Sequence, residues 1–177
     1  MNRSERAALI AELLDEMNKR GSWSGATHLQ KCVFYLESAL KVPLDYDFIL
    51  YKHGPYSFDL RDDLTEMQVL GVLEVQANPM PYGPSFLSTA LSKTLRSKVS
   101  SVKDYGKQIE FVAENLGPLG VTALERLSTA QFVNLENPKG SRDQLAKRIH
   151  ELKPHVPIDL AARAVDQLKK LQETVPA

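Results

Sequence analysis

Apolar residues recur along much of this chain at the spacing of amphipathic helices. In residues 4–20 the apolar positions lie three or four residues apart, at Ala8, Leu9, Leu13, Leu14 and Met17. Ser4 precedes this segment as an N-cap, and Lys19-Arg20-Gly21 ends it with cations and a glycine. The pattern predicts a helix over this segment.

A second helix is predicted from Thr27 to about Lys41. Thr27-His-Leu-Gln30 has the form of a capping box, in which the Thr27 hydroxyl and the Gln30 side chain each bond the other residue's amide. Its apolar residues form a broad stripe that includes Cys32 and Leu36, so we expect this helix to be central to the core.

The stretch Phe48-Ile-Leu-Tyr-Lys-His-Gly-Pro-Tyr-Ser57 is an apolar strand signal that ends in a Gly-Pro turn. Ser57 is then placed to cap a third helix, residues 58–70, and Gly71 to end it. Leu60, Leu64, Met67 and Leu70 share one face of that helix. The pattern predicts a rigid joint, residues 51–56, between strand and helix.

Two further strand signals, residues 72–76 and 85–91, flank a loop rich in proline and glycine at residues 77–84. The order helix, helix, strand, helix, strand, loop, strand is that of a winged helix, with this hairpin as the wing. We therefore predict a winged-helix-like N-terminal domain over residues 1–92.

The rest of the chain has helical patterns at residues 94–116, as one helix or two, and at residues 122–135, 142–152 and 158–171. Ser141 is placed to cap the third of these, and Gly106 weakens the first. Short connections favour a helical bundle as a second domain, residues 93–177. The predicted fold class is mainly α with a small β-hairpin, α+β overall.

Composition and charge add little that is specific. Of 177 residues, 43% are apolar and 25% charged, which is typical of a globular protein. Residues 1–92 carry 8 Lys/Arg and 12 Asp/Glu, whereas residues 93–177 carry 14 and 10, so neither half is strongly basic. With no apolar run long enough for a membrane span and no signal-peptide pattern, we expect a cytoplasmic protein with no membrane association. The single Cys32 is expected to be a buried, reduced thiol.

Catalytic and metal-binding signals are weak. The four histidines have no ligand-like spacing with Cys32, and the acidic cluster Asp59, Asp62, Asp63 and Glu66 contains Arg61 and is typical of a solvated helix face. The Gly117-Pro-Leu-Gly120 loop lacks the Lys-Ser/Thr of a phosphate-binding loop. We expect no enzyme activity, no cofactor and no metal.

Two short motifs carry a family resemblance. Leu29-Gln-Lys-Cys-Val-Phe-Tyr35, followed about fifteen residues later by Tyr51-Lys-His-Gly-Pro-Tyr-Ser57, resembles the paired signature of the Panacea or SocA-like antitoxin domain. The chain is closer still to the uncharacterised YwgA-like bacterial proteins, whose pattern also has a Leu-Lys-Pro segment, as in Leu152-Lys-Pro-His155. The resemblance covers residues 27–75 well and the C-terminal helices loosely, and His53 stands where the Panacea pattern commonly has Tyr.

The resemblance implies a winged-helix-related fold without catalytic residues that acts by binding proteins, as SocA-like antitoxins neutralise a toxin or present it to a protease. The motif positions map onto Gln30, Lys31, Tyr51, His53, Gly54, Pro55 and Tyr56. The match leaves open whether these residues touch a partner or build the fold. We expect an antitoxin-like or adaptor protein that engages a protein partner through the joint and the wing loop with Met80 and Tyr82.

The alternative is a transcriptional regulator that binds DNA with a basic segment after the wing. Its candidate phosphate contacts are Lys93, Arg96, Lys98, Lys103 and Lys107. The acidic third helix and a wing loop without Lys or Arg count against docking in the major groove. The sequence leaves the oligomeric state open.

Overall fold

The computed structural model describes residues 1–80 and 83–176, and it is mainly helical with two small antiparallel hairpins, which confirms the α+β class. The elements are α1 Arg3–Lys19, α2 Ala26–Ser38, β1 Ile49–Tyr51, β2 Gly54–Tyr56, α3 Phe58–Val69, β3 Leu73–Gln76, β4 Ser85–Ser88, α4 Ala90–Lys98, α5 Ser101–Asp104, α6 Gly106–Asn115, α7 Val121–Glu136, α8 Arg142–Leu152 and α9 Ile158–Glu173.

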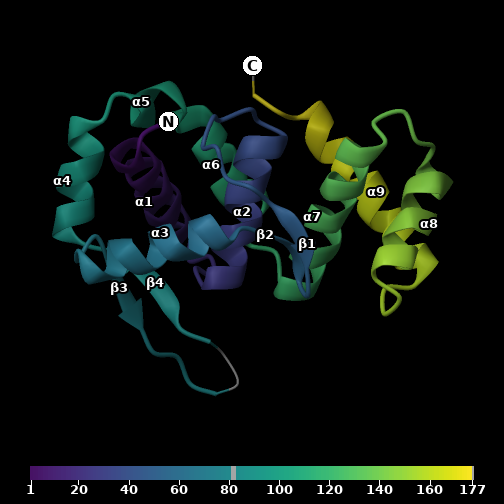
Figure 1. Ribbon diagram of the computed structural model, residues 1–177, viewed down its shortest axis with the longest axis horizontal. Helices are drawn as coiled ribbons and strands as arrows, with labels where there is room; N and C mark the ends of the chain where they lie inside the picture. Colours follow the sequence, from purple (N-terminus) through teal and green to yellow (C-terminus); the bar gives the residue numbers. More distant parts are fainter. Residues whose placement is uncertain (81–82, 177) are drawn as a thin grey trace.

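In Figure 1, α2 lies near the middle of the molecule, and α1 lies between α2 and α4. Helices α4 to α6 cover α1 on one side, and α7 packs against α2 on the other, with α9 and α8 beyond it. One hydrophobic core runs across these layers, from Leu13 on α1 through Leu29 on α2 to Leu124 on α7 and Val165 on α9. The expected domain boundary near residue 92 falls inside α4, and this core extends on both sides of it.

The N-cap of the first helix lies two residues earlier than predicted. Asn2, not Ser4, is the N-cap: its side chain accepts from the Glu5 amide, and the Glu5 side chain accepts from the Asn2 amide. The expected end is confirmed, since Gly21 has a φ of 66°. Arg96 on α4 donates to Glu12 at 2.8 Å and to Asp15 at 2.6 Å, which ties α4 to α1.

The capping box predicted for α2 does not form. The N-cap is Gly25, and the Gln30 side chain instead bonds the backbone of Ser57, which is buried and must find its hydrogen-bond partners within the protein. The helix also ends at Ser38 rather than near Lys41, whose φ is 59°.

The central stretch forms a hairpin rather than a strand followed by a Gly-Pro turn. Strand β1 pairs with β2 in the register Ile49 with Tyr56 and Leu50 with Pro55, so the Gly-Pro pair lies within the second strand. Pro55 has no N–H, and a non-hydrogen-bonded pair is the position at which an antiparallel ladder tolerates that loss. The turn therefore falls two residues earlier than predicted, at Lys52-His53.

The third helix and the β3–β4 hairpin follow the prediction with local differences. The Ser57 hydroxyl accepts from the Leu60 amide as an N-cap, and Gly71 has a φ of 72°. Leu70, expected to face inward, is the C-cap residue just after the last helical residue and is 60% exposed. Strands β3 and β4 pair as predicted, but β4 ends at Ser88 because Thr89 caps α4.

The C-terminal half contains more helices than the pattern predicted. Residues 94–116 are divided among α4, α5 and α6, whereas α8 begins after its predicted cap Ser141 and matches its predicted bounds. The Ser141 hydroxyl accepts from the Gln144 amide.

Cys32 offers a direct check of this packing. Its side chain is fully buried, and burial raises the pKa of its thiol to about 12. We expect iodoacetamide to label Cys32 only when the chain unfolds, since the thiolate is the reactive form. Mass spectrometry with and without denaturant measures this, and complete labelling of the native protein within minutes would contradict the packing.

Candidate functional site

The hairpin β1–β2 rests on two buried polar side chains of α2. Gln30 is 1% exposed; its Nε2 donates to the Ser57 carbonyl at 2.9 Å, and its Oε1 accepts from the Ser57 amide at 2.8 Å. Lys31 is also 1% exposed, and its Nζ donates to the Pro55 carbonyl at 2.8 Å. Together these side chains bond the backbone edge of β2 as a neighbouring strand would.

Helix α7 approaches the same hairpin closely. Gly54 has a φ of 89°, and a Cβ placed there would lie 3.3 Å from Ser128 Oγ and 3.4 Å from Thr129 Oγ1 and Lys31 Cε. Both the positive φ and the short distances favour glycine at this position. The glycine of the motif therefore lets the hairpin fit between α2 and α7.

A third support comes from the segment that follows α8. Lys153 is 6% exposed, and its Nζ donates to the carbonyls of Tyr51 at 2.6 Å and Lys52 at 2.7 Å. In the sequence this segment lies between the helices predicted at residues 142–152 and 158–171. Its one signal was the Leu152-Lys-Pro match to the YwgA-like pattern.

The Glu125 carboxylate of α7 balances the charges under the joint. Glu125 Oε1 lies 3.4 Å from His155 Nε2 and 3.7 Å from Lys153 Nζ, and its Oε2 lies 3.8 Å from His53 Nδ1. Burial lowers the pKa of Lys31 to about 8, with Glu125 opposing this shift and the Lys153 charge adding to it. No sequence pattern linked Glu125 to the joint.

The outer face of the hairpin carries an exposed cluster of three rings, which we call the aromatic patch: Tyr51, Tyr56 and Phe58. Ring centroids lie 5.6 Å apart for Tyr51 and Tyr56, 5.9 Å for Tyr51 and Phe58, and 5.2 Å for Tyr56 and Phe58. Tyr51 is 54% exposed and Phe58 44%. Arg61 stacks on Phe58 with 5.2 Å from its guanidinium carbon to the ring centroid.

The structure separates the predicted partner-binding residues into two groups. Tyr51, Tyr56 and His53 are at the surface of the joint, whereas Gln30 and Lys31 lie beneath it, where burial keeps their side chains from a partner. Met80, in the loop after β3, is 91% exposed. Tyr82 lies outside the described residues. Phe58, the third ring of the patch, had been assigned only to the helix start.

The predicted basic segment extends over three successive helices. Lys93, Lys98, Lys103 and Lys107 are exposed but distributed over α4, α5 and α6. Arg96 faces α1 instead, where Glu12 and Asp15 neutralise it and leave its side chain 13% exposed.

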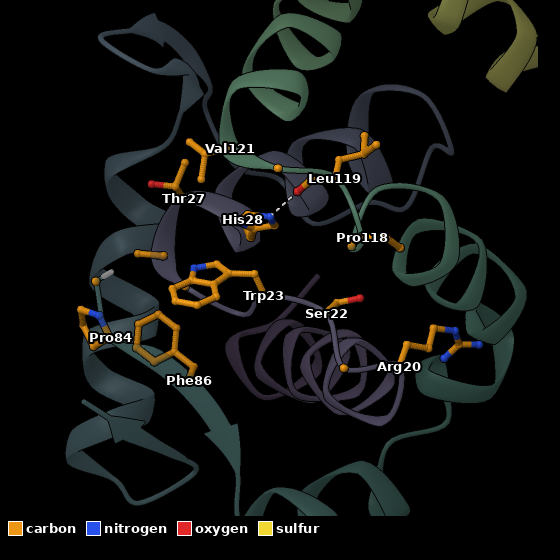
Figure 2. A pocket seen from close by; sticks show the side chains of 16 residues that line it. Arg20, Ser22, Trp23, Thr27, His28, Pro84, Phe86, Pro118, Leu119 and Val121 are labelled. Carbon is orange, nitrogen blue, oxygen red and sulfur yellow. Dashed lines mark hydrogen bonds between the residues drawn. The ribbon is translucent and has the colours of Figure 1, made fainter. Parts of the chain in front are cut away.

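A cavity of about 650 Å³ lies between the α1–α2 loop, the start of β4 and the α6–α7 loop. Figure 2 shows Trp23 and Phe86 on one side of it and Leu119 and Val121 on the other. The N-caps of α2 and α7, Gly25 and Gly120, both line it. In the sequence, Gly120 is notable only as the end of a loop that lacks the Lys-Ser/Thr of a phosphate-binding loop.

Within residues 1–80 and 83–176, no group of three or more His, Cys, Asp or Glu side chains is arranged to hold a metal ion. In the same part of the chain, no helix has the length and apolar content needed to cross a bilayer. Comparisons with protein-family models and with curated protein sequences find no match to this chain.

The buried Lys31 predicts a specific pH dependence of stability. In the folded protein its ammonium loses a proton near pH 8, but in the unfolded chain only near 10.5. Between these values the unfolded chain binds more protons, so the Lys31 contribution to stability rises with pH. We expect the free energy of unfolding of the wild type, minus that of Lys31→Met, to rise by about 1–3 kcal/mol from pH 8 to pH 10.5.

Urea unfolding of both proteins across this pH range measures the difference. Other groups that titrate in this range, Cys32 included, are present in both proteins, so their effects cancel. A difference that is flat or falls with pH would contradict the assignment of Lys31 as a buried amine with a lowered pKa.

Proposed function

We propose that this protein is a non-catalytic protein-binding module that docks a partner protein on the aromatic patch. The observation that carries the proposal is a cluster of three contacting rings, of which Tyr51 and Phe58 are exposed and Tyr56 is half-buried. The backbone that carries the cluster is held from below by Gln30, Lys31 and Lys153. The resemblance to SocA-like antitoxins supports an antitoxin-like or adaptor role, with a toxin or a protease as the partner. In the same proposal, α1 to β4 act as a winged-helix-like unit.

Exposed aromatic side chains suit such a surface for two physical reasons. A tyrosine or phenylalanine offers a large apolar area with few rotatable bonds, so little conformational entropy is lost when a partner covers it. Contact between the rings restricts them further before binding. Tyrosine is accordingly enriched among the residues that dominate binding free energies in protein interfaces.

The buried side chains contribute by fixing the backbone that carries the rings. Each bonds a carbonyl or amide of residues 51–57, so the patch is presented in one geometry rather than on a mobile loop. In this proposal, the exposed rings contact the partner, and the buried Gln30 and Lys31 hold the backbone that carries the rings.

DNA binding is less well supported. Arg96, one of the five candidate phosphate contacts, is already paired with two carboxylates of α1. The exposed face of α3 carries Asp59, Asp62 and Glu66, which would repel phosphates. Recovery of nucleic acid instead of a protein partner would therefore count against the proposal.

A pair of double variants tests the docking surface. Tyr51→Ala/Phe58→Ala removes the two most exposed rings of the patch, and Val69→Ala/Leu70→Ala removes two exposed apolar side chains, 82% and 60% exposed, at the far end of α3. Both should fold, since exposed side chains contribute little to stability. Immobilised wild type and both variants are exposed to native cell extract at moderate and high salt.

We expect one partner protein to be retained at high salt by the wild type and by the Val69/Leu70 control. Retention by the Tyr51/Phe58 variant should fall at least roughly tenfold, because each lost aromatic anchor costs at least about 1 kcal/mol of binding free energy. Equal retention by all three proteins, or recovery of nucleic acid alone with release by salt, would overturn the proposal.

A further inference from the structure

The cavity in Figure 2 brings together the N-termini of two long helices. The first intrahelical bonds run from the Leu29 amide to the Gly25 carbonyl at 3.1 Å and from the Leu124 amide to the Gly120 carbonyl at 2.9 Å. The amides before them in each helix have no carbonyl within the helix to bond. Both N-caps are glycines, so neither supplies a capping side chain.

Two helix N-termini at one cavity create a positive potential there. Each helix end carries the equivalent of about half a positive charge, concentrated on its free amides. The two ends repel each other, and an anion placed between them would be attracted to both. Helix N-termini are established binding sites for phosphate and carboxylate groups.

His28 is an independent indication of a ligand. It lines the cavity, its side chain is 1% exposed, and its Nε2 lies 2.7 Å from the Leu119 carbonyl (Figure 2). Because a carbonyl only accepts, Nε2 carries the proton and Nδ1 is left with a lone pair. That Nδ1 has no hydrogen-bond partner among the residues that the structure describes. A ligand hydroxyl group would satisfy it.

The remaining walls are mostly apolar, with Arg20, Ser22 and Thr27 as further polar side chains of the lining. Trp23 and Phe86 lie on one side, and Pro118, Leu119 and Val121 on the other (Figure 2). A volume of about 650 Å³ falls in the range of small-molecule pockets, which combine apolar walls with a few polar groups that fix orientation.

We propose that this cavity binds a small organic anion that has an apolar body and a hydroxyl group beside its charged head. The charged head lies between the N-termini of α2 and α7, the hydroxyl donates to His28 Nδ1, and the apolar body packs between Trp23, Phe86 and Leu119. This binding site is independent of the aromatic patch.

Three related probes test the ligand chemistry by isothermal titration calorimetry on the full chain. The probe 3-phenyllactate has the anion, the hydroxyl and the apolar body; 3-phenylpropanoate lacks the hydroxyl; and 3-phenylpropane-1,2-diol lacks the charge. We expect 3-phenyllactate to bind at least roughly tenfold more tightly than the diol and more tightly than 3-phenylpropanoate. Undetectable binding of both acids, or binding of the diol as tight as that of 3-phenyllactate, would overturn the proposal.

A substitution at Gly120 separates binding from folding. Gly120 has the φ of −65° and ψ of 154° of an ordinary N-cap, and a Cβ there would meet no atom within 4 Å. In Gly120→Asp the new carboxylate would cap α7 and occupy the anion position from within the chain. Gly120→Ala adds a Cβ without a carboxylate and serves as the control.

We expect Gly120→Asp to keep or raise the melting temperature of the ligand-free protein while weakening 3-phenyllactate binding at least roughly tenfold. Gly120→Ala should bind within about twofold of the wild type. A stable Gly120→Asp that binds as tightly as the wild type would place the anion elsewhere and overturn the assignment.

Discussion

The paired hydrogen bonds between the Gln30 side chain and the backbone of Ser57 determine how the rest of the joint is arranged. They bond the backbone amide and the backbone carbonyl of Ser57, which is fully buried, at 2.8 and 2.9 Å. The Ser57 carbonyl also accepts from the Arg61 amide at 3.2 Å, so the Ser57 amide is the group that depends on Gln30. A buried backbone amide without a partner costs about 1–3 kcal/mol, and Gln30 Oε1 removes that cost where the hairpin meets the core. From Ser57 the chain continues directly into α3, whose first turn the same residue caps.

Charge compensation is the second requirement of this arrangement. Lys31 and Lys153 each bring an ammonium group into the interior, and each donates to hairpin carbonyls rather than to a directly bonded carboxylate. Glu125 lies close enough to Lys153 and His155 to offset the accumulated positive charge. Residues from α2, α7 and the segment after α8 therefore meet under three-residue strands, and the C-terminal helices are part of the structure that supports the joint.

Periodicity and capping signals predicted most helices, because these features depend on residues close together in sequence. Helix α8 with its Ser141 cap and α3 with its Ser57 cap are examples. The same local logic was wrong for Gln30, whose preferred partner lies 27 residues away, and for Pro55, whose place in a strand depends on the residue opposite it. Glu125 and Lys153 were missed for the same reason, since their role appears only when distant segments meet.

The cavity could not be predicted from sequence patterns, because it forms between segments that are far apart in the sequence. Gly25 and Gly120 each look like ordinary loop glycines, and only the packing of α2 against α7 brings their helix ends together. The aromatic patch could be predicted in part. Tyr51 and Tyr56 belong to the short motif of residues 51–57, whereas Phe58 joins them because the hairpin leads directly into α3.

The central claim is that a buried glutamine holds the hairpin that carries the patch, and amide hydrogen exchange followed by NMR tests it most directly. In the wild type the Ser57 amide should exchange slowly, because its partner is Gln30 Oε1 in a buried site. In Gln30→Ala this protection should be lost. The Phe86 amide of β4, which bonds the Ser24 carbonyl of the loop between α1 and α2, should keep its protection. Rapid exchange of Ser57 in the wild type, or equal protection in both proteins, would contradict the account.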